Sequence, residues 1–583
     1  MTNHQNRANE AAFEKENGGG FSAGATSYDP NKISPLRHER RRLGERTSLS
    51  SNFNKEVVWH SSGITVNHLT ILEKESLGTT TTEGPPICSA GSGFFEAPGA
   101  TLSQISLRRQ AAAPPPPAWS RYHEIAFIVC VCLAQFLSLA CLAQTVALSL
   151  IIGNSFNVEN PGQLSWFTAS YSMTLGTFIL PAGRLGDMFG HKRIYILGWL
   201  WLALWCCICG FAHSWGPVVF SVARGCQGIA PALLVPNAIA LIGRTFPVGE
   251  KRALVLSLVG ACGPTGFLTG AAMSSLLAQL LWWPWVFWVT AISAICITFF
   301  ATCIVPDSMA MLDFPPGVTK PTFDYLGCFT GVSGLLLVNF ALNQAPLAGW
   351  SEPYVYSLLI TGFLLILAFF CVEFSYSPHP LLPVRELYPQ AWILLACIAA
   401  GWASHGIWIY YFFRFLTSIR NLTPLEASLE LVPVAPVGIA FALSTNYLIK
   451  RIHVSKIMLL SMIFFLVGSV LLAFAPADQT YWAQTFLSVL ITPGGMNLSF
   501  PAGTILISNA MLREHQGKAG SLITTVINYS IASGLGLAGS IEKHIDSDHS
   551  RLLDGYRGAW ELGIGFSALG VMISMYFVWK SAW

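Results

Sequence analysis

The chain has 583 residues, of which 53% are hydrophobic and 11% are charged, and its formal net charge at pH 7 is +3. A soluble protein carries about 25% charged residues, so this composition excludes an ordinary soluble globular protein. Runs of about 20 apolar residues, the length at which a helix crosses a bilayer, recur from about residue 124 to the C-terminus. We therefore expect an all-α polytopic protein whose surroundings are a lipid bilayer.

Residues 1–120 differ from the rest of the chain. Their first 32 residues contain almost no large apolar residues, and the segment ends in the proline-rich stretch AAAPPPPAW. Such a segment cannot bury enough surface to offset the entropy lost on ordering, so we expect a disordered cytoplasmic tail. The basic cluster from Arg37 to Arg42 is typical of a solvated charged tail, and contact with anionic lipid is the alternative.

Fourteen apolar runs follow the tail, and each is long enough to span the membrane as a helix. They cover residues 124–152, 164–184, 193–213, 217–243, 253–279, 284–305, 323–345, 353–374, 391–417, 424–448, 454–475, 480–508, 519–540 and 558–580.

The Lys and Arg residues between these runs predict the orientation, because cytoplasmic loops carry an excess of them. With the N-terminus inside, thirteen lie in cytoplasmic gaps: Arg184, Lys192, Arg193, Arg244, Lys251, Arg252, Lys320, Arg385, Lys450, Arg451, Lys456, Arg513 and Lys518. Four lie in outside gaps: Arg420, Lys543, Arg551 and Arg557. We therefore expect both termini to be cytoplasmic.

The stretch GRLGDMFGHKR, residues 183–193, lies between the second and third runs. It resembles the loop G-x-L-x-D-(R/K)-x-G-(R/K)-(R/K) of the major facilitator superfamily, and six residues match: Gly183, Leu185, Asp187, Gly190, Lys192 and Arg193. The resemblance implies a cytoplasmic latch in which the aspartate pairs with basic groups and a facing helix end. Met188 replaces a basic residue of the motif and His191 departs mildly, so we expect Lys192 or Arg193 to supply the counter-charge. An ordinary charged loop that anchors two helices is the alternative.

Two further elements of the membrane region resemble the same superfamily. The fourth run contains RGCQG, residues 224–228, which is similar to the R-x-x-Q-G element and implies a coupling role for Arg224 and Gln227. The alternative is a structural arginine that bonds backbone carbonyls of the first run. The fifth run contains Gly263 and Pro264, the core of an element typical of drug:H+ antiporters. Proline removes a helical hydrogen bond, so this pair predicts a kink, either static or part of alternating access.

Fourteen runs rather than twelve resemble the fourteen-spanner drug:H+ antiporter branch, which adds two helices between two six-helix halves. The stretch from Gly162 to Asp187 is most similar to the fungal aminotriazole-resistance, boron-efflux and low-affinity ammonium transporter group. The implied division is a half at 121–305, two linker helices with their loops at 306–390, and a second half at 391–583.

Proton coupling needs a titratable group that is exposed to each side in turn. The stretch from Phe127 to Gly153 in the first run and the stretch from Ser521 to Ser540 in the thirteenth contain no ionisable carboxylate. His405, near the middle of the ninth run, and Glu430, in the tenth, are the deep candidates, and a hydrogen-bonded structural histidine is the alternative for His405. Gln144 and Asn497 are candidate residues of a substrate pathway, or else helix-to-helix hydrogen bonds.

These patterns predict a secondary transporter that exports a small compound by alternating access across the plasma membrane, with a vacuolar membrane as the alternative site. Protons are the expected coupling ion. The rival functions are an uncoupled facilitator or uptake carrier for a solute such as ammonium or borate, and a transporter-like nutrient sensor. The cysteines lack zinc spacing, and neither a P-loop nor a nucleophile–base set is recognisable. We thus expect no enzyme activity, cofactor, metal or nucleic-acid partner, and a monomer.

Overall fold

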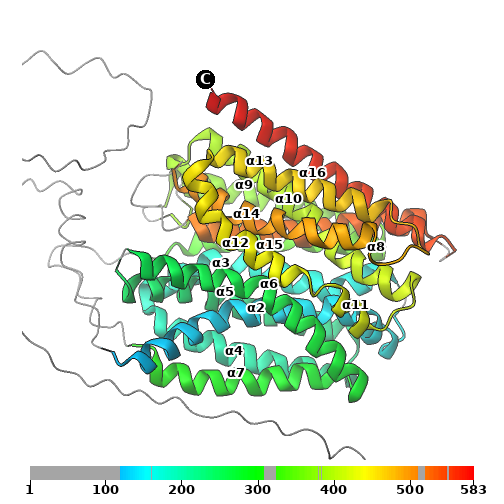
Figure 1. Ribbon diagram of the computed structural model, residues 1–583, viewed down its shortest axis with the longest axis horizontal. Coiled ribbons are helices and arrows are strands. Elements are labelled where there is room, and N and C mark those ends of the chain that lie inside the picture. Colours follow the sequence, from blue (N-terminus) through cyan, green and yellow to red (C-terminus); the bar gives the residue numbers. More distant parts are fainter. Residues whose placement is uncertain are drawn as a thin grey trace, which may run out of the picture. The chain divides into compact units, whose positions relative to one another are not determined.

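The computed structural model describes residues 119–582, apart from 159, 248, 307–322, 378–379, 383, 510–518 and 548–549. The tail predicted to be disordered, residues 1–120, lies almost wholly outside the described residues. The described part is built of helices joined by short connections, as expected (Figure 1).

The helices follow the predicted runs in order. The first group comprises α2 (Arg121–Ser155), α3 (Pro161–Phe189), α4 (His191–Phe211), the short η1 (Ala212–Ser214), α5 (Pro217–Thr245), α6 (Glu250–Leu280) and α7 (Pro284–Ile304). The central pair is α8 (Tyr325–Ala348) and α9 (Pro353–Ser375), followed by the short η3 (Val384–Glu386). The last group comprises α10 (Pro389–Arg414), η4 (Phe415–Ile419), α11 (Pro424–Glu430), α12 (Val434–Arg451), α13 (Val454–Ala473), α14 (Gln484–Asn509), α15 (Ala519–Ile545) and α16 (Leu552–Ala582).

Twelve of the described helical segments are long and apolar enough to cross a membrane. The protein is therefore a multi-pass membrane protein. The predicted count of fourteen spans is not confirmed exactly, because α3 and α14 are not among the twelve. Both are long, with 29 and 26 residues, but Gly, Ser, Thr and Pro make up much of their sequences.

Local sequence signals set where several helices begin. Proline occupies the first turn of α3, α5, α7, α9, α10 and α11, where its missing N–H costs nothing. The Asn160 side chain accepts from the Gly162 N–H at the start of α3, and Asp324 accepts from Gly327 at the start of α8. Thr423 and Glu426 form a reciprocal capping box on α11.

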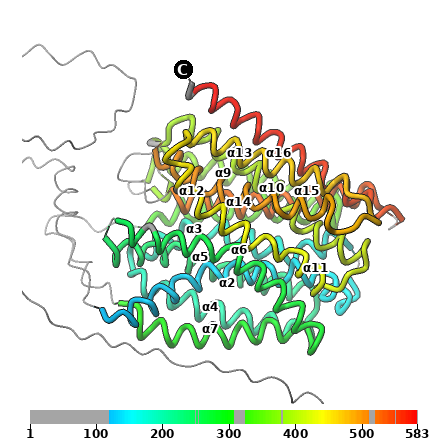
Figure 2. The backbone as a smooth tube through the Cα atoms, viewed as in Figure 1, coloured from blue at the N-terminus to red at the C-terminus, as the bar shows by residue number. Residues whose placement is uncertain are grey.

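The helices pack in two groups with α8 and α9 beside them. Helices α2–α7 lie together in blue to green, and α10–α16 lie together in yellow-green to red (Figure 2). Helix α3 of the first group packs directly against α15 of the second, and α8 packs against both. The boundaries predicted for the two halves and the linker remain a prediction.

Close approach of backbones makes glycine necessary at two of these contacts. A Cβ at Gly176 of α3 would lie 2.8 Å from the Tyr529 nitrogen of α15. A Cβ at Gly266 of α6 would lie 2.3 Å from the Phe136 carbonyl oxygen of α2. Small residues let helices approach closely in lipid, where dispersion contacts rather than water exclusion hold them together. Gly266 thus explains why α2 and α6 pack along their length.

Candidate functional site

A central cavity lies between the two groups of helices. Its walls come from α2, α3 and α6 on one side and from α10, α12, α14 and α15 on the other. Its cavity volume is about 60 Å³, within about 760 Å³ of non-atom space that includes open solvent. The lining side chains are aliphatic and aromatic, with Phe267, Trp402, Trp408 and Tyr410 the largest, and none of them is Asp, Glu, Lys or Arg.

His405 is the titratable imidazole of this cavity. It is 7% exposed, and its ring stacks on Trp408 at 5.8 Å between centroids and meets Trp402 edge-on at 5.5 Å. Its Nδ1 atom is buried without a hydrogen-bond partner. The sequence placed His405 deep in a span, and the structure adds that it lines the cavity.

Helix α11 of the second group contacts α6 of the first. Ser428 of α11 lies 3.1 Å from Ser275 of α6, oxygen to oxygen, and so links the two groups of helices. Leu431, directly after α11, lines the cavity.

Arg224 lies behind the cavity wall and is fully buried. Its guanidinium donates to the Phe167 carbonyl at 3.2 Å, to the Cys141 carbonyl at 3.0 Å, to Thr145 Oγ1 at 2.9 Å and to the Gln227 amide oxygen. The Tyr171 ring lies 4.6 Å from the charge. Cys141 belongs to α2, so Arg224 bonds a backbone carbonyl of the first span, as the structural alternative predicted, while its coupling role stays a prediction.

A hydroxyl relay links Arg224 to the cavity. Thr168, a lining residue, donates to Thr145 Oγ1 at 3.3 Å, and Thr145 also accepts from Arg224. Gln227 completes the network by donating to the Cys206 sulfur. Arg224 thus reaches the cavity through two threonines rather than by direct contact.

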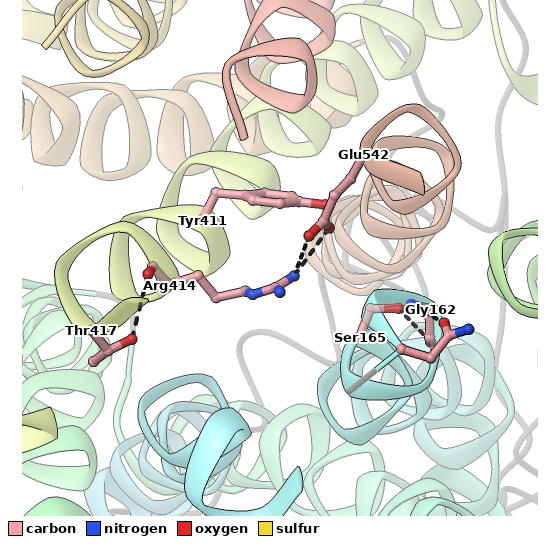
Figure 3. Close-up of polar contacts among 7 residues, drawn as sticks. Gly162, Ser165, Tyr411, Arg414, Thr417 and Glu542 are labelled. Carbon is pink, nitrogen blue, oxygen red and sulfur yellow. Dashed lines mark hydrogen bonds and ion pairs between the residues drawn. The ribbon is translucent and has the colours of Figure 1, made fainter. Parts of the chain in front are cut away.

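A buried ion pair in the second group was missed by the sequence analysis. Arg414 of α10 donates to both carboxylate oxygens of Glu542 on α15, at 2.8 and 3.0 Å, and the Tyr411 hydroxyl donates to Glu542 at 2.7 Å. Figure 3 shows Arg414 and Tyr411 reaching from one helix toward Glu542 on another. The Arg414 and Glu542 side chains are 4% and 1% exposed.

The prediction that the thirteenth span lacks a carboxylate was therefore wrong. We ended that span at residue 540, whereas α15 continues to Ile545 and includes Glu542. The polar sequence Glu542-Lys543-His544 hid the last turn of the helix from a search for apolar runs. Two charged residues could have revealed the ion pair from sequence: Glu542 just after the end of the thirteenth run and Arg414 near the end of the ninth. Charged side chains in a membrane are rare and are usually paired.

Asp187 of the predicted latch lies beside His191. Its Oδ1 is 3.5 Å from His191 Nε2, four residues along the chain, and the Arg244 guanidinium of α5 acts electrostatically on Asp187. The expected counter-charge from Lys192 or Arg193 stays a prediction. His191 is buried, and its Nδ1 lies 2.7 Å from Asn237 Oδ1. His191, which departs mildly from the motif, is thus the residue that connects the loop to α5.

Two glycines of the loop have evident geometric reasons. Gly190 has φ of +96°, a conformation that other residues avoid, and it separates α3 from α4. A Cβ at Gly186 would fall 1.8 Å from Asn237 Oδ1, so the packing leaves no room for a side chain at this position. Gly183 has its nearest neighbour, Pro236, at 3.9 Å, and meets no such constraint. Arg193 is exposed.

The other predicted pathway residues lie away from the cavity wall. Gln144 donates to Thr290 of α7 at 2.8 Å, Asn497 donates to the Pro493 carbonyl at 2.9 Å, and Glu430 has a buried Oε2 without a hydrogen-bond partner. Burial lowers the pKa of Arg420, a shift that the Glu430 carboxylate opposes. Of the six residues predicted for coupling or substrate contact, His405 is the one that lines the cavity.

The Gly263–Pro264 pair lies at the centre of the bundle. Pro264 lines the cavity, and its ring approaches Gly438 of α12, where a Cβ would lie 3.2 Å away. Helix α6 runs from Glu250 to Leu280 without interruption at Pro264. The predicted kink stays a prediction, and the contact across the two groups of helices is the observed feature.

The comparison with protein families gives one match over most of the membrane region. The model described as Major Facilitator Superfamily matches residues 127–537. The chain belongs to the Major Facilitator Superfamily. Its resemblance to that superfamily, stated from the loop at 183–193, is thereby confirmed.

The relatives of this superfamily member are fungal transporters. It is 46% identical to the low affinity ammonium transporter of Saccharomyces cerevisiae over 459 residues, which is 79% of this chain and 89% of that protein. It is 42% identical to the efflux pump terJ of Aspergillus terreus over 466 residues, 78% of this chain and 88% of the pump. It is 34% identical to the aminotriazole resistance protein of S. cerevisiae over 469 residues, 80% and 85% of the two chains.

Solved structures confirm the fold. A peptide transporter POT in complex with sulfate superposes with a TM-score of 0.59 at 13% sequence identity, covering 80% of this chain and 96% of that one. At this identity the likeness shows the fold alone. The relatives and this neighbour are transporters, and the protein is a membrane transporter of the same superfamily.

Proposed function

We propose that this transporter exports small, uncharged, largely apolar organic compounds by alternating access of its two helix groups, α2–α7 and α10–α16. The observation that carries the proposal is the cavity between these groups, whose lining has aromatic and aliphatic side chains and no charged residue. Such a wall favours apolar solutes and penalises ions, which would lose hydration without finding a partner. The relative terJ of Aspergillus terreus is an efflux pump, which supports this direction of transport.

The test is accumulation of Nile red, an uncharged planar dye, in yeast cells that express the full chain. We expect lower steady-state accumulation than in cells with an empty vector, and recovery of accumulation when the membrane potential and pH gradient are collapsed. Equal accumulation with and without the protein at verified surface expression contradicts the proposal. Surface expression itself tests the proposed plasma-membrane location, for which the vacuolar membrane is the alternative.

We further propose that transport is coupled to proton movement and that Glu542 is the group that binds the proton. Its carboxylate is buried among Arg414, Tyr411, Tyr410, Tyr556 and Asp546, all of which act on it electrostatically. The Arg414 charge lies 5.8 Å from the ring of Tyr410, which lines the cavity. A proton that binds Glu542 removes the negative charge of the pair and leaves Arg414 without its partner. Because Arg414 and the lining residue Tyr410 both belong to α10, a proton and a cavity ligand act on the same helix.

A low-affinity carrier for ammonium is the second candidate. The 46% identity to the yeast protein of that name favours it. The test is uptake of radiolabelled methylammonium by the same cells at millimolar concentration. Methylammonium uptake above the vector control, together with unchanged Nile red accumulation, favours the carrier over the exporter.

We also propose that the loop at residues 183–193 acts as a cytoplasmic latch, with both termini on the same side. Asp187, His191 and Asn237 join α3, the start of α4 and α5 there. Asp187→Asn is expected to slow Nile red efflux severalfold while changing the free energy of unfolding by less than about 1 kcal/mol, because the Asp187 side chain is 51% exposed. Normal efflux by this variant at equal surface level would make the loop an ordinary anchor.

A further inference from the structure

His405 leaves its hydrogen-bonding capacity unused. A neutral imidazole has one N–H donor and one lone-pair acceptor. Neither ring nitrogen bonds to another group among the residues that the structure describes, and Nδ1 is fully buried. Buried polar atoms are almost always paired, so an unpaired imidazole in a cavity wall calls for a partner that enters the cavity.

The aromatic frame around His405 is already fixed. Trp402 donates its indole N–H to Ser499 at 3.1 Å, and Trp408 donates to Ser488 at 2.8 Å, both on α14. The polar atoms of the two tryptophans are therefore satisfied, and both side chains line the cavity, where the Trp408 ring stacks with His405 and Phe412. His405 lies between them in sequence at three-residue spacing, so all three share one face of α10.

The two threonines of the lining have partners. Thr168 donates to Thr145, and Thr492 donates to the Ser488 carbonyl at 2.8 Å. The Tyr410 hydroxyl, like His405 Nδ1, is buried without a hydrogen-bond partner. His405 and Tyr410 are thus the lining residues at which a ligand can form a hydrogen bond without breaking an existing one, and His405 is the one that can both donate and accept through two ring nitrogens.

We propose that His405 is the specificity-determining residue of the cavity and that it hydrogen-bonds the single polar group of an uncharged aromatic solute, such as a phenol, whose ring packs on Trp402 and Trp408. The inference rests on the proposed function and names its substrate class. Aromatic walls favour a planar ring, and the open imidazole selects rings that bear a hydroxyl or carbonyl over bare hydrocarbons.

The experiment measures binding of two matched probes, 2-naphthol and naphthalene, to the full chain in lipid nanodiscs, with empty nanodiscs as background. The quantity is the ratio of the two dissociation constants, naphthalene over 2-naphthol, which cancels partition into lipid between variants. We expect the ratio to fall about three- to tenfold in His405→Phe, the value of one net hydrogen bond. His405→Gln, which keeps a donor and an acceptor, is expected to retain most of the ratio.

The matched control is Ser404→Ala, one residue away, because Ser404 is buried against Ser469 and lies outside the cavity lining. Its ratio is expected to equal that of the wild type. A wild-type ratio that survives in folded His405→Phe, with both probes bound, overturns the inference and leaves the proposed function standing. Failure of the wild type to bind either probe overturns both. Monodisperse elution of each variant on size-exclusion chromatography establishes that it is folded.

Discussion

Two of the arginines that the structure describes are buried, Arg224 and Arg414, and their positive charges are balanced differently. Arg224, in the first group of helices, bonds two backbone carbonyls, a threonine and a glutamine, and has no ion pair among the described residues. Arg414, in the second group, bonds a carboxylate that itself accepts from Tyr411. Dipoles that cannot titrate fix the environment of Arg224, whereas the Glu542 partner of Arg414 can take up a proton. Burial of an arginine alone therefore does not identify a proton-coupling site. What matters is whether the partner of the arginine can bind and release a proton.

The largest expected effect comes from breaking the Arg414–Glu542 pair on one side. Arg414→Met leaves a buried carboxylate without its cation and is expected to lower the free energy of unfolding by about 3–5 kcal/mol. The double variant Arg414→Met/Glu542→Leu removes both charges and is expected to regain most of that loss. Thermal unfolding in detergent measures both. A double variant no more stable than the single one would contradict the assignment of the pair as mutually neutralising.

The second-largest expected loss of stability comes from replacing Arg224, the arginine that has no carboxylate partner among the described residues. Arg224→Met leaves the Phe167 and Cys141 carbonyls and the Gln227 amide without their donor, and hydrogen bonds to a charged group contribute about 1.5–3 kcal/mol each. We expect a loss of about 2–4 kcal/mol that adds to the loss in Glu542→Leu. If Glu542→Leu instead restored the stability lost in Arg224→Met, the charges of the two regions would be coupled, which would contradict the comparison.

A smaller effect probes the polar partner of Glu542. Tyr411→Phe removes one hydrogen bond to the carboxylate and is expected to destabilise the protein by about 1.5–3 kcal/mol, the range for a bond to a charged group. The loss should vanish when Tyr411→Phe is made in a Glu542→Leu background, because the acceptor is then absent. A double-mutant cycle of thermal stabilities measures this coupling. Full additivity would place Tyr411 outside the Glu542 site.

Sequence alone predicted the order of the helices and offered a structural Arg224 as one of two alternatives, because both leave local marks. Apolar runs locate spans, and an arginine within a run must bond to protein. The cavity position of His405 could not be derived, because these helices are apolar on nearly all sides and periodicity does not show which side faces the centre. The roles of Glu542 and His191 depend on partners 128 and 46 residues away in the chain, Arg414 and Asn237. Such pairings arise from packing rather than from any local motif.

The measurement that tests the account most directly is substrate-driven proton movement in proteoliposomes with an imposed pH gradient and a pH-sensitive dye inside. For the wild-type chain, addition of Nile red is expected to dissipate the gradient. Glu542→Gln is expected to abolish that dissipation while Nile red exchange between the two sides continues. Dissipation by Glu542→Gln at the wild-type rate would contradict the assignment of Glu542 as the proton-coupling carboxylate.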